Sequence, residues 1–345
     1  MTAQAHTIEA FVKLGQTFSD FVKHPEQTEN QDLKQVLLQA ERKNAWFTQK
    51  QLHQALQEWA LLLTKEALEQ WVTPYGFKEA QTPKTIAIIM AGNIPLVGFH
   101  DFLCVLLSGN KVLAKLSSND NVLLPYVANH LANFYPELKN NIAFTEERLT
   151  GFDAVIATGS NNTSRYFEHY FGKYPNIIRK NRNSVAVLTG KESSKDLIAL
   201  GEDVFRYFGL GCRNVSKIFV PKGYDFDLLF KAMFGYQDII HHNKYANNYD
   251  YNKAVYLMSN IALLDNGFLL LKEDASHASP ISVLFYQYYS QKKNLEHLLA
   301  ENKDALQCIV THLEIPQAIS FGQTQKPTLS DYADDVDTLA FLRAL

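Results

Sequence analysis

Residues 205–220 read Phe-Arg-Tyr-Phe-Gly-Leu-Gly-Cys-Arg-Asn-Val-Ser-Lys-Ile-Phe-Val, and this stretch joins a predicted helix to a predicted strand. Apolar side chains recur at helical spacing over residues 197–208, whereas residues 216–220 alternate as in a short strand. Gly209 and Gly211 are expected to end the helix, because glycine adopts positive φ without a Cβ clash. The two glycines therefore mark a tight connection between two rigid elements.

Cys212 follows Gly211 on this connection. A cysteine on such a turn is accessible, points in a fixed direction and has backbone N–H groups nearby that can stabilise developing negative charge. These are the requirements of a catalytic nucleophile. The alternative is a small buried residue near a helix end, since cysteine outside disulfides is among the most buried residue types. Cys104 and Cys308 complete a sparse, odd-numbered set without Cys-x-x-Cys spacing, which argues against a disulfide framework and a metal site.

Size and composition exclude several classes of protein. With 345 residues the chain is long for a single core, which favours two domains. The net charge of −3, from 33 basic and 36 acidic residues, leaves no basic excess to hold nucleic acid. No apolar run reaches the roughly 18 residues of a transmembrane helix. The N-terminal residues also lack a signal pattern, so we expect a cytoplasmic protein without a membrane span.

The first half of the chain predicts helices followed by a parallel sheet. Residues 7–72 repeat apolar side chains at helical spacing, with Thr48 as an N-cap. Strands are predicted at residues 85–90, 111–116, 141–144 and 153–157, and helices at residues 95–108, 121–134 and 160–172. This order predicts a doubly wound α/β sheet, in which ligands bind at the carboxyl ends of the strands.

A second α/β unit begins with a strand predicted at residues 184–188. Further strands are predicted near residues 267–271, 281–287 and 306–310, and helices near residues 226–236 and 249–263. We therefore expect one domain over residues 1–183, a second over residues 184–322 that carries Cys212, and a tail over residues 323–345 that packs back on them.

Polar side chains follow two of the predicted strands, where ligands are expected. Asn93, in the loop after the first strand, could donate a hydrogen bond to an oxyanion or carbonyl, or it could bond its own backbone in a turn. Lys115 ends the second strand and is followed by Ser117 and Ser118. These side chains could hold a ribose or a phosphate. The alternative is a lysine at the sheet edge followed by a serine that only caps the next helix.

A third candidate site opens the helix predicted after residue 157. Thr158, Gly159 and Ser160 could direct helix N–H groups at a pyrophosphate, or Ser160 could only cap the helix. The chain has no Gly-x-Gly-x-x-Gly fingerprint, so a standard Rossmann dinucleotide loop is unsupported. His241 and His242 have no cysteine or carboxylate at metal-ligand spacing, and we expect them in a polar surface loop.

These motifs follow one another in a characteristic order. An Asn-x-Pro loop precedes a strand that ends in lysine, a Thr-Gly-Ser helix start, a Ser-x-Ala-Val strand and a Gly-x-Gly-Cys turn. Over residues 85–220, and more loosely through 279–285 and 319–322, this order resembles the aldehyde dehydrogenase superfamily, and within it the LuxC-type acyl-CoA reductase family. The resemblance implies two doubly wound α/β domains, each with a mostly parallel sheet, preceded by N-terminal helices.

The resemblance also implies roles for individual residues. Cys212 matches the nucleophile of the family, and Asn93 matches the asparagine that binds the substrate oxyanion. Lys115 matches the lysine on the adenosine ribose of the cofactor. Gly159 and Ser160 match the pair beside the cofactor pyrophosphate.

The chain departs from the aldehyde dehydrogenase pattern at three carboxylates, and the glutamate that the family places on the nicotinamide ribose has no match near residues 273–280. Ser118 stands where many NAD-dependent members carry a glutamate that binds both ribose hydroxyls. Without that carboxylate a 2′-phosphate meets no repulsion, so the expected cofactor is NADPH, with NADH as the alternative. Residues 174–189 contain no carboxylate, although hydrolytic members carry a water-activating glutamate in this region. An acyl group on the cysteine should therefore be exchanged with CoA or reduced, and only slowly hydrolysed.

We accordingly expect NAD(P)H-dependent reduction of a fatty acyl-CoA to the aldehyde, with a thioester on Cys212 as the intermediate. Aromatic residues after residue 205 could line an acyl tunnel. A homo-oligomer and an acyl-supplying partner enzyme are further expectations. The alternatives are a CoA-acylating aldehyde dehydrogenase, an acyl-phosphate reductase, a cysteine hydrolase, and a catalytically silent member of the fold that acts as a binding or scaffold protein.

Overall fold

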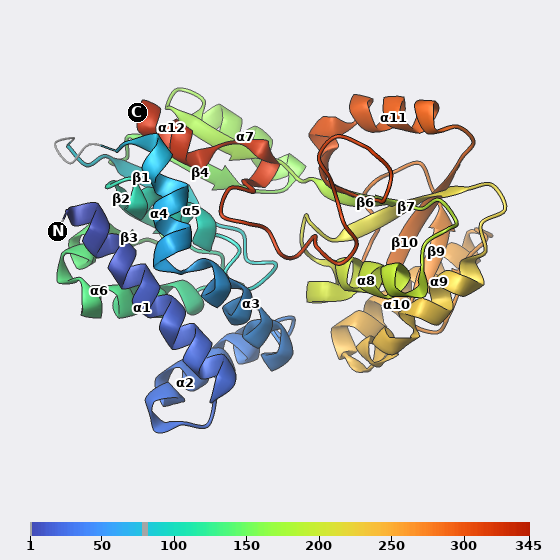
Figure 1. Ribbon diagram of the computed structural model, residues 1–345, viewed down its shortest axis with the longest axis horizontal. Helices are drawn as coiled ribbons and strands as arrows, with labels where there is room; N and C mark the ends of the chain where they lie inside the picture. The colour runs from blue at the N-terminus through green and yellow to red at the C-terminus, as the bar shows by residue number, and fades with distance from the viewer. Residues whose placement is uncertain (1, 78–81) are drawn as a thin grey trace. The chain divides into compact units, whose positions relative to one another are not determined.

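The computed structural model describes residues 2–77 and 82–345. The chain forms two compact units, Met1–Lys180 with Thr328–Leu345, and Asn181–Pro327. These ends differ by a few residues from the boundaries expected at 183 and 323, and the roles expected of the two domains stay predictions. Figure 1 follows the chain from its N-terminus in blue to its C-terminus in red. No helix in the two described ranges is long and apolar enough to cross a membrane.

Five strands of the first unit form one parallel sheet. They are β1 (Thr85–Ile89), β2 (Lys111–Lys115), β3 (Ile142–Phe144), β4 (Ala154–Thr158) and β5 (Asn176–Arg179). Their order across the sheet is β3-β2-β1-β4-β5. The chain therefore moves outward from β1 to β3 and then continues on the other side with β4 and β5, which is the doubly wound arrangement that the sequence predicts.

Helices α5 (Phe99–Leu107), α6 (Leu123–Phe134) and α7 (Asn161–Phe171) connect these strands. The first of them begins later than the sequence predicts, because Leu96 adopts a left-handed φ of 57° that a helix excludes. β5 has no counterpart among the predicted strands. Its four residues offer only Ile177 and Ile178 as apolar side chains, too few for a recognisable period.

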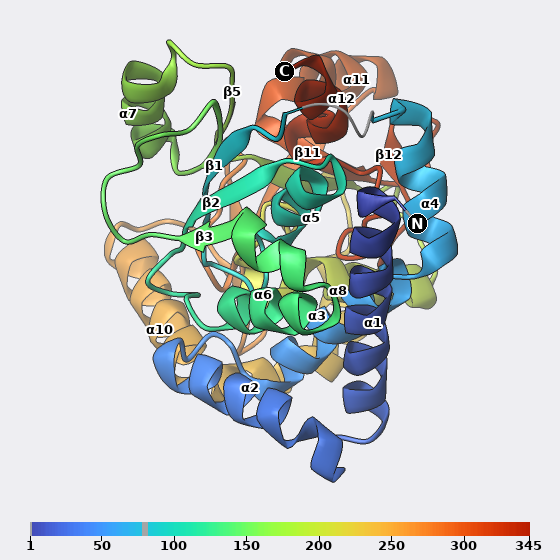
Figure 2. The ribbon, with the colours of Figure 1, turned by 90° about the vertical axis from the view of Figure 1, so that its left-hand side faces the viewer.

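Four helices precede the sheet: α1 (Ala3–Lys23), α2 (Gln31–Lys43), α3 (Gln49–Leu62) and α4 (Lys65–Val72). Thr48 caps α3 as predicted, since its hydroxyl accepts a hydrogen bond from the Gln51 N–H at 3.4 Å. Figure 2 shows α1, α3 and α6 next to one another. Phe11 of α1 packs on Phe99 of α5 with ring centroids 6.0 Å apart, so these helices share one core with the sheet.

The C-terminal segment completes the first unit. Leu339 and Leu342 of α12 (Thr338–Ala344) are buried in the same core. At the end of β5, the Arg179 guanidinium pairs with both carboxylate oxygens of Asp101 on α5 and donates to the Thr338 hydroxyl at 3.0 Å. One buried ion pair therefore joins a strand and two helices.

Seven strands form the sheet of the second unit. They are β6 (Asn183–Val187), β7 (Val215–Pro221), β8 (Leu264–Asp265), β9 (Leu270–Glu273), β10 (Val283–Tyr289), β11 (Leu306–Val310) and β12 (Ala318–Ile319). Their order is β12-β11-β6-β7-β10-β9-β8, and only the β8–β9 pair is antiparallel among the described residues. Helices α8 (Ser194–Phe205) and α9 (Phe226–Met233) cover one face, and α11 (Lys292–Glu301) covers the other, as Figure 1 shows.

Two predictions for this unit need correction. Helix α10 (Asn243–Met258) begins before residue 249, because His242 caps it by accepting the Tyr245 N–H at 3.4 Å. His241 therefore ends the 3-10 helix Phe234–His241, and His242 is the N-cap of α10. The prediction of a polar surface loop at these two histidines is wrong. β9 begins at Leu270 instead of residue 267, since Gly267 has a φ of 92° and turns the chain between β8 and β9.

Candidate active site

The turn that follows α8 has a strained backbone. Three consecutive residues are left-handed: Tyr207 with φ 52°, Phe208 with φ 58° and Gly209 with φ 77°. A left-handed conformation is predicted for Gly209. The sequence places Tyr207 and Phe208 in the preceding helix, and that part of the prediction is wrong. A left-handed conformation costs a residue with a Cβ roughly 1–2 kcal/mol. Such strain persists where surrounding contacts enforce it, and it is concentrated at functional sites.

Asn214 supplies those contacts from the other end of the turn. Its side-chain NH₂ donates to the carbonyl oxygens of Arg206 at 2.8 Å and Asp203 at 3.1 Å. Its side-chain oxygen accepts the Gly211 N–H at 2.8 Å. The side chain is 2 % exposed, so these bonds form away from water. The sequence predicts no role for Asn214, and its position two residues after the cysteine is the only signal that distinguishes it.

Cys212 is exposed on this turn, whereas Cys104 and Cys308 are buried. Its carbonyl oxygen accepts a hydrogen bond from the Ser184 hydroxyl of β6 at 3.0 Å. Burial raises the pKa of the Cys104 thiol well above its usual value, which disfavours the reactive thiolate there. The buried interpretation of Cys212 is therefore wrong, and its nucleophilic role stays a prediction.

Asp203 links the turn to the segment after β12. Its buried carboxylate accepts the backbone N–H groups of Gly322 at 2.7 Å and Thr324 at 3.0 Å, and the Thr324 hydroxyl at 2.8 Å. Burial raises the pKa of Asp203, and these hydrogen bonds act in the opposite direction. Because the Asp203 carbonyl also accepts from Asn214, the same residue braces two segments.

Two side chains at the start of β7 hold the segment after β9. The Ser216 hydroxyl donates to the His277 carbonyl at 2.6 Å. The Lys217 ammonium donates to the Ala275 carbonyl at 2.6 Å and to the Gln287 side-chain oxygen at 2.7 Å. Burial lowers the pKa of Lys217 to about 8. The strand that follows Cys212 is thus tied to a neighbouring loop by two main-chain carbonyls.

Three neighbouring strands of the first unit end at one edge of the sheet, and the predicted residues follow them. Ile89 at the end of β1 pairs with Lys115 of β2 and with Ala157 of β4. Asn93 lies in the bend after β1, and Thr158 ends β4. The winding direction changes between β1 and β4, which is where doubly wound sheets bind ligands.

The loops after β1 and β2 touch each other. A Cβ on Gly92 would lie 2.6 Å from the Ser117 Cβ, so only glycine fits there. The Asn44 side chain donates to the carbonyl oxygens of Gly92 at 3.5 Å and Asn119 at 3.3 Å. Asn44 is the C-cap of α2, so the N-terminal helices hold this edge in place, a role for which the sequence gives no local signal.

Asp120 supports the strained residue of the Asn93 loop. Its carboxylate accepts the N–H of left-handed Leu96 at 3.1 Å. Burial raises the pKa of Asp120 to about 6, whereas hydrogen bonds from the Leu96 and Leu123 backbones lower it.

The predicted ribose site lies at the end of β2. The Lys115 ammonium donates to the Glu147 carbonyl at 3.0 Å, and the Ser117 hydroxyl accepts the Asn119 N–H at 3.2 Å. Ser118 is exposed. The structure thus places a cation and two hydroxyl-bearing residues in one short segment at this edge.

The predicted pyrophosphate site opens α7. The Ser160 hydroxyl caps this helix by accepting the Thr163 N–H at 3.3 Å. A Cβ on Gly159 would lie 2.8 Å from the Phe167 ring, so glycine is needed for the close approach of loop and helix. Thr158 precedes them as the last residue of β4.

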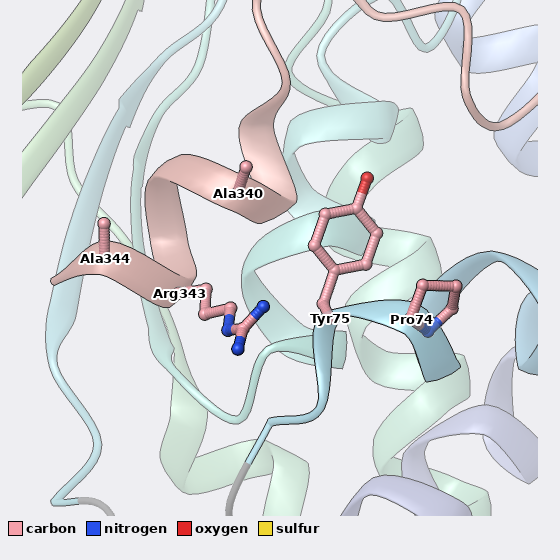
Figure 3. Close-up of a pocket in the computed structure, with 5 residues that line it drawn as sticks. All are labelled: Pro74, Tyr75, Ala340, Arg343 and Ala344. Atoms are coloured by element: carbon pink, nitrogen blue, oxygen red, sulfur yellow. The ribbon is translucent and has the colours of Figure 1, made fainter.

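A hollow of about 420 Å³ lies in the first unit, away from the predicted site residues. It is lined by Pro74, Tyr75, Ala340, Arg343 and Ala344 (Figure 3). The Tyr75 hydroxyl is bonded to Asp337 at 2.8 Å. No predicted site residue lines this hollow, so it is not the candidate site. The described part of the chain also contains no group of three His, Cys, Asp or Glu side chains that could hold a metal ion.

Comparison with known proteins identifies one matching family. The model of the acyl-CoA reductase (LuxC) family matches residues 5–229, which include Asn93, the loops after β2 and β4, and Cys212. No curated protein matches the chain.

Several solved structures have a similar fold. Aldehyde dehydrogenase 21 from Physcomitrella patens, in complex with the product succinate, is 12% identical with a TM-score of 0.66, covering 91% of this chain and 74% of that one. An NADP-dependent enzyme of E. coli is 12% identical with a TM-score of 0.60, covering 90% and 73%. A mutant of the P. syringae indole-3-acetaldehyde dehydrogenase AldA, bound to NAD+, is 11% identical with a TM-score of 0.62, covering 92% and 73%. These likenesses show the aldehyde dehydrogenase fold.

Proposed function

The chain belongs to the LuxC acyl-CoA reductase family, and on that premise we propose that it reduces a fatty acyl-CoA to the aldehyde through an acyl group held on Cys212. The observation that carries this proposal is the exposed cysteine on a turn braced by Asn214 and Ser184, inside the matched region. The proposal makes the chain an NADPH-dependent oxidoreductase that acts on a thioester.

In the proposed first step the Cys212 thiolate attacks the thioester carbonyl. A new C–S bond forms, the bond to the CoA sulfur breaks, and CoA leaves as a thiolate that takes up a proton. The resemblance assigns the oxyanion to the Asn93 amide and the Cys212 N–H, and one such donor is typically worth roughly 3 kcal/mol. Residues 174–189 offer no carboxylate to activate water, and Arg179 among them is engaged by Asp101.

The proposed place of a nicotinamide dinucleotide is the edge of the first sheet at which β1, β2 and β4 end, which is supported by the change of winding direction between β1 and β4 and by the helix start capped by Ser160. Lys115, Ser117 and Ser118 would hold its adenosine ribose, and the Gly159–Ser160 helix start, which follows Thr158, its pyrophosphate. When bound, the cofactor supplies the hydride that brings the acyl group to the aldehyde level. The exposed Ser118, in place of a carboxylate, favours NADPH over NADH.

Intact-mass spectrometry tests the proposal directly. The protein is mixed with palmitoyl-CoA in the absence of nicotinamide, and we expect one acyl adduct that Cys212→Ala lacks. Adding NADPH should then remove the adduct and release the aldehyde. Cys308→Ala is the matched control and should retain the adduct.

Absence of an adduct for every acyl-CoA tried would overturn the proposal and favour a silent member of the fold or an acyl-phosphate reductase. Turnover to a free acid without nicotinamide would instead indicate a cysteine hydrolase. A homo-oligomer, an acyl-supplying partner enzyme and a cytoplasmic location belong to the same proposal, and light scattering of the purified protein tests the first of them.

A further inference from the structure

One histidine lies beside the start of the strand that follows Cys212. His277 belongs to the segment between β9 and β10, and its carbonyl oxygen accepts the Ser216 hydroxyl at 2.6 Å. The same hydroxyl lies 3.5 Å from the Ser184 carbonyl oxygen, and the Ser184 hydroxyl donates to the Cys212 carbonyl at 3.0 Å. Two serines on adjacent strands therefore hold the backbones of His277 and Cys212.

The order of the strands brings the same parts of the chain together. β11, β6, β7 and β10 are successive parallel strands of the second sheet, so their first residues share one edge. Cys212 comes shortly before β7, and His277 comes shortly before β10. Asn302, whose side chain hydrogen-bonds to that of His277, comes shortly before β11. Cys212 and His277 therefore lie at the same edge of this sheet.

The His277 imidazole has a nitrogen that the fold does not use. Its Nδ1 is buried, and none of the described residues hydrogen-bonds to it. Burial and the nearby charge of Lys217 lower the pKa of His277 below 6.5, although the hydrogen bond with Asn302 acts in the opposite direction. The Asp274 carboxylate, which pairs with Lys272, favours the charged form of Lys217. The imidazole is therefore mainly neutral at pH 7, and a neutral imidazole has one nitrogen lone pair that can take up a proton.

We propose that His277 is the base that takes the proton of the Cys212 thiol when the sulfur attacks the acyl-CoA. The inference rests on the proposed function, since it takes the acylation of Cys212 as given. In this step the S–H bond of Cys212 breaks, its proton moves to the imidazole, and the new C–S bond to the acyl group forms. The bond from the acyl carbon to the CoA sulfur then breaks, and the imidazolium returns the proton to that sulfur. His277 is thus unchanged when acylation is complete.

The pH dependence of Cys212 alkylation by iodoacetamide, followed by intact mass, tests the inference without acyl-CoA. The neutral imidazole must be present to take the proton, so the rate in the unmodified protein should rise with pH through a pKa below 6.5. In His277→Gln only the thiolate formed without a base reacts, and the rise should move toward about pH 8.5, the usual pKa of a cysteine. Because about 3 % of such a thiol is ionised at pH 7, we expect alkylation, and acylation by palmitoyl-CoA, to slow by about 30-fold at that pH.

His297→Gln is the matched control, because His297 lies on α11 of the same unit, is exposed and pairs with Glu301 at 3.3 Å. It should leave the pH dependence unchanged. Added imidazole should restore alkylation in His277→Ala, which a purely structural role of the side chain would not allow. Urea midpoints show which variants are folded. Ser216→Ala, which loosens the His277 segment and keeps the imidazole, replaces the His277 variants if they are not folded, and it should slow alkylation without moving its pH dependence.

The outcomes separate the inference from the proposed function. The same pH dependence in folded His277→Gln and in the unmodified protein, or an unchanged rate in Ser216→Ala where that variant is used, would overturn the inference and leave the proposed function intact. Alkylation that depends on His277, without an adduct from any acyl-CoA, would instead refute the proposed function and retain His277 as the base for Cys212.

Discussion

A single buried amide holds the turn on which Cys212 lies. Asn214 donates to three carbonyl oxygens, those of Asp203, Val204 and Arg206, and accepts the Gly211 N–H. Replacing it with alanine leaves these groups buried without that partner, and each such group costs about 1–3 kcal/mol. We expect Asn214→Ala to lower the free energy of unfolding by roughly 3 kcal/mol and to slow acylation of Cys212.

Urea unfolding and the rate of adduct formation measure the two effects. Asn214→Asp is the matched control, because it keeps the shape and the acceptor for Gly211 but loses both donors. At neutral pH we expect a loss at least as large as that of Asn214→Ala, because the new carboxylate would face the carbonyl oxygens of Asp203 and Arg206 away from water. Equal stability of Asn214→Ala and the unmodified protein would show that the amide does not brace the turn. The sequence points to Cys212 through its two glycines, but Asn214 could not be found, since its partners are carbonyls of a helix end whose geometry no period predicts.

At the scale of elements, the loop after β1 depends on a carboxyl group. Asp120 accepts the N–H of left-handed Leu96, and burial raises its pKa from 3.8 to about 6. A raised pKa in the folded state means that the protonated form stabilises the fold. This stability is fully present below pH 3.8 and is lost as pH rises through about 6.

We therefore expect the unmodified protein to lose roughly 3 kcal/mol of unfolding free energy relative to Asp120→Asn between about pH 4 and pH 6. Asparagine keeps the acceptor for Leu96 and does not titrate, so the comparison cancels the other ionisable groups. Urea unfolding at a series of pH values measures the difference. A constant difference across this range would show that Asp120 does not titrate there.

Elements with a clear period could be predicted from the sequence, and elements set by turns could not. The apolar runs predict β1, β2, β4 and the parallel, doubly wound order, and that order brings the ends of β1, β2 and β4 to one edge. Whether the residues there bind a cofactor stays a prediction. β5 is too short to show a period, and the start of α10 depends on a histidine cap. Asn44, which braces the loops from a distant helix, has no local signal.

At the scale of the whole molecule, the second unit is inserted into the first, so the first unit is built from two distant segments. Leu339 and Leu342 of α12 are 0% and 4% exposed in the core of the first unit, and Thr338 accepts from Arg179. A fragment of residues 1–180 would expose this part of the core. Burying two leucines contributes roughly 3–6 kcal/mol, which is a large share of the stability of a domain.

We expect residues 181–327 to fold alone, because they have their own sheet and their own hydrophobic clusters. Residues 1–180 alone should unfold at lower urea than the same residues joined by a short glycine-serine linker to residues 328–345. Leu342→Asp in the joined fragment is the control, and it should lower the urea midpoint to that of residues 1–180 alone. Circular dichroism along a urea series measures all four proteins. Equal urea midpoints with and without the C-terminal segment would mean that α12 does not contribute to the stability of the first unit.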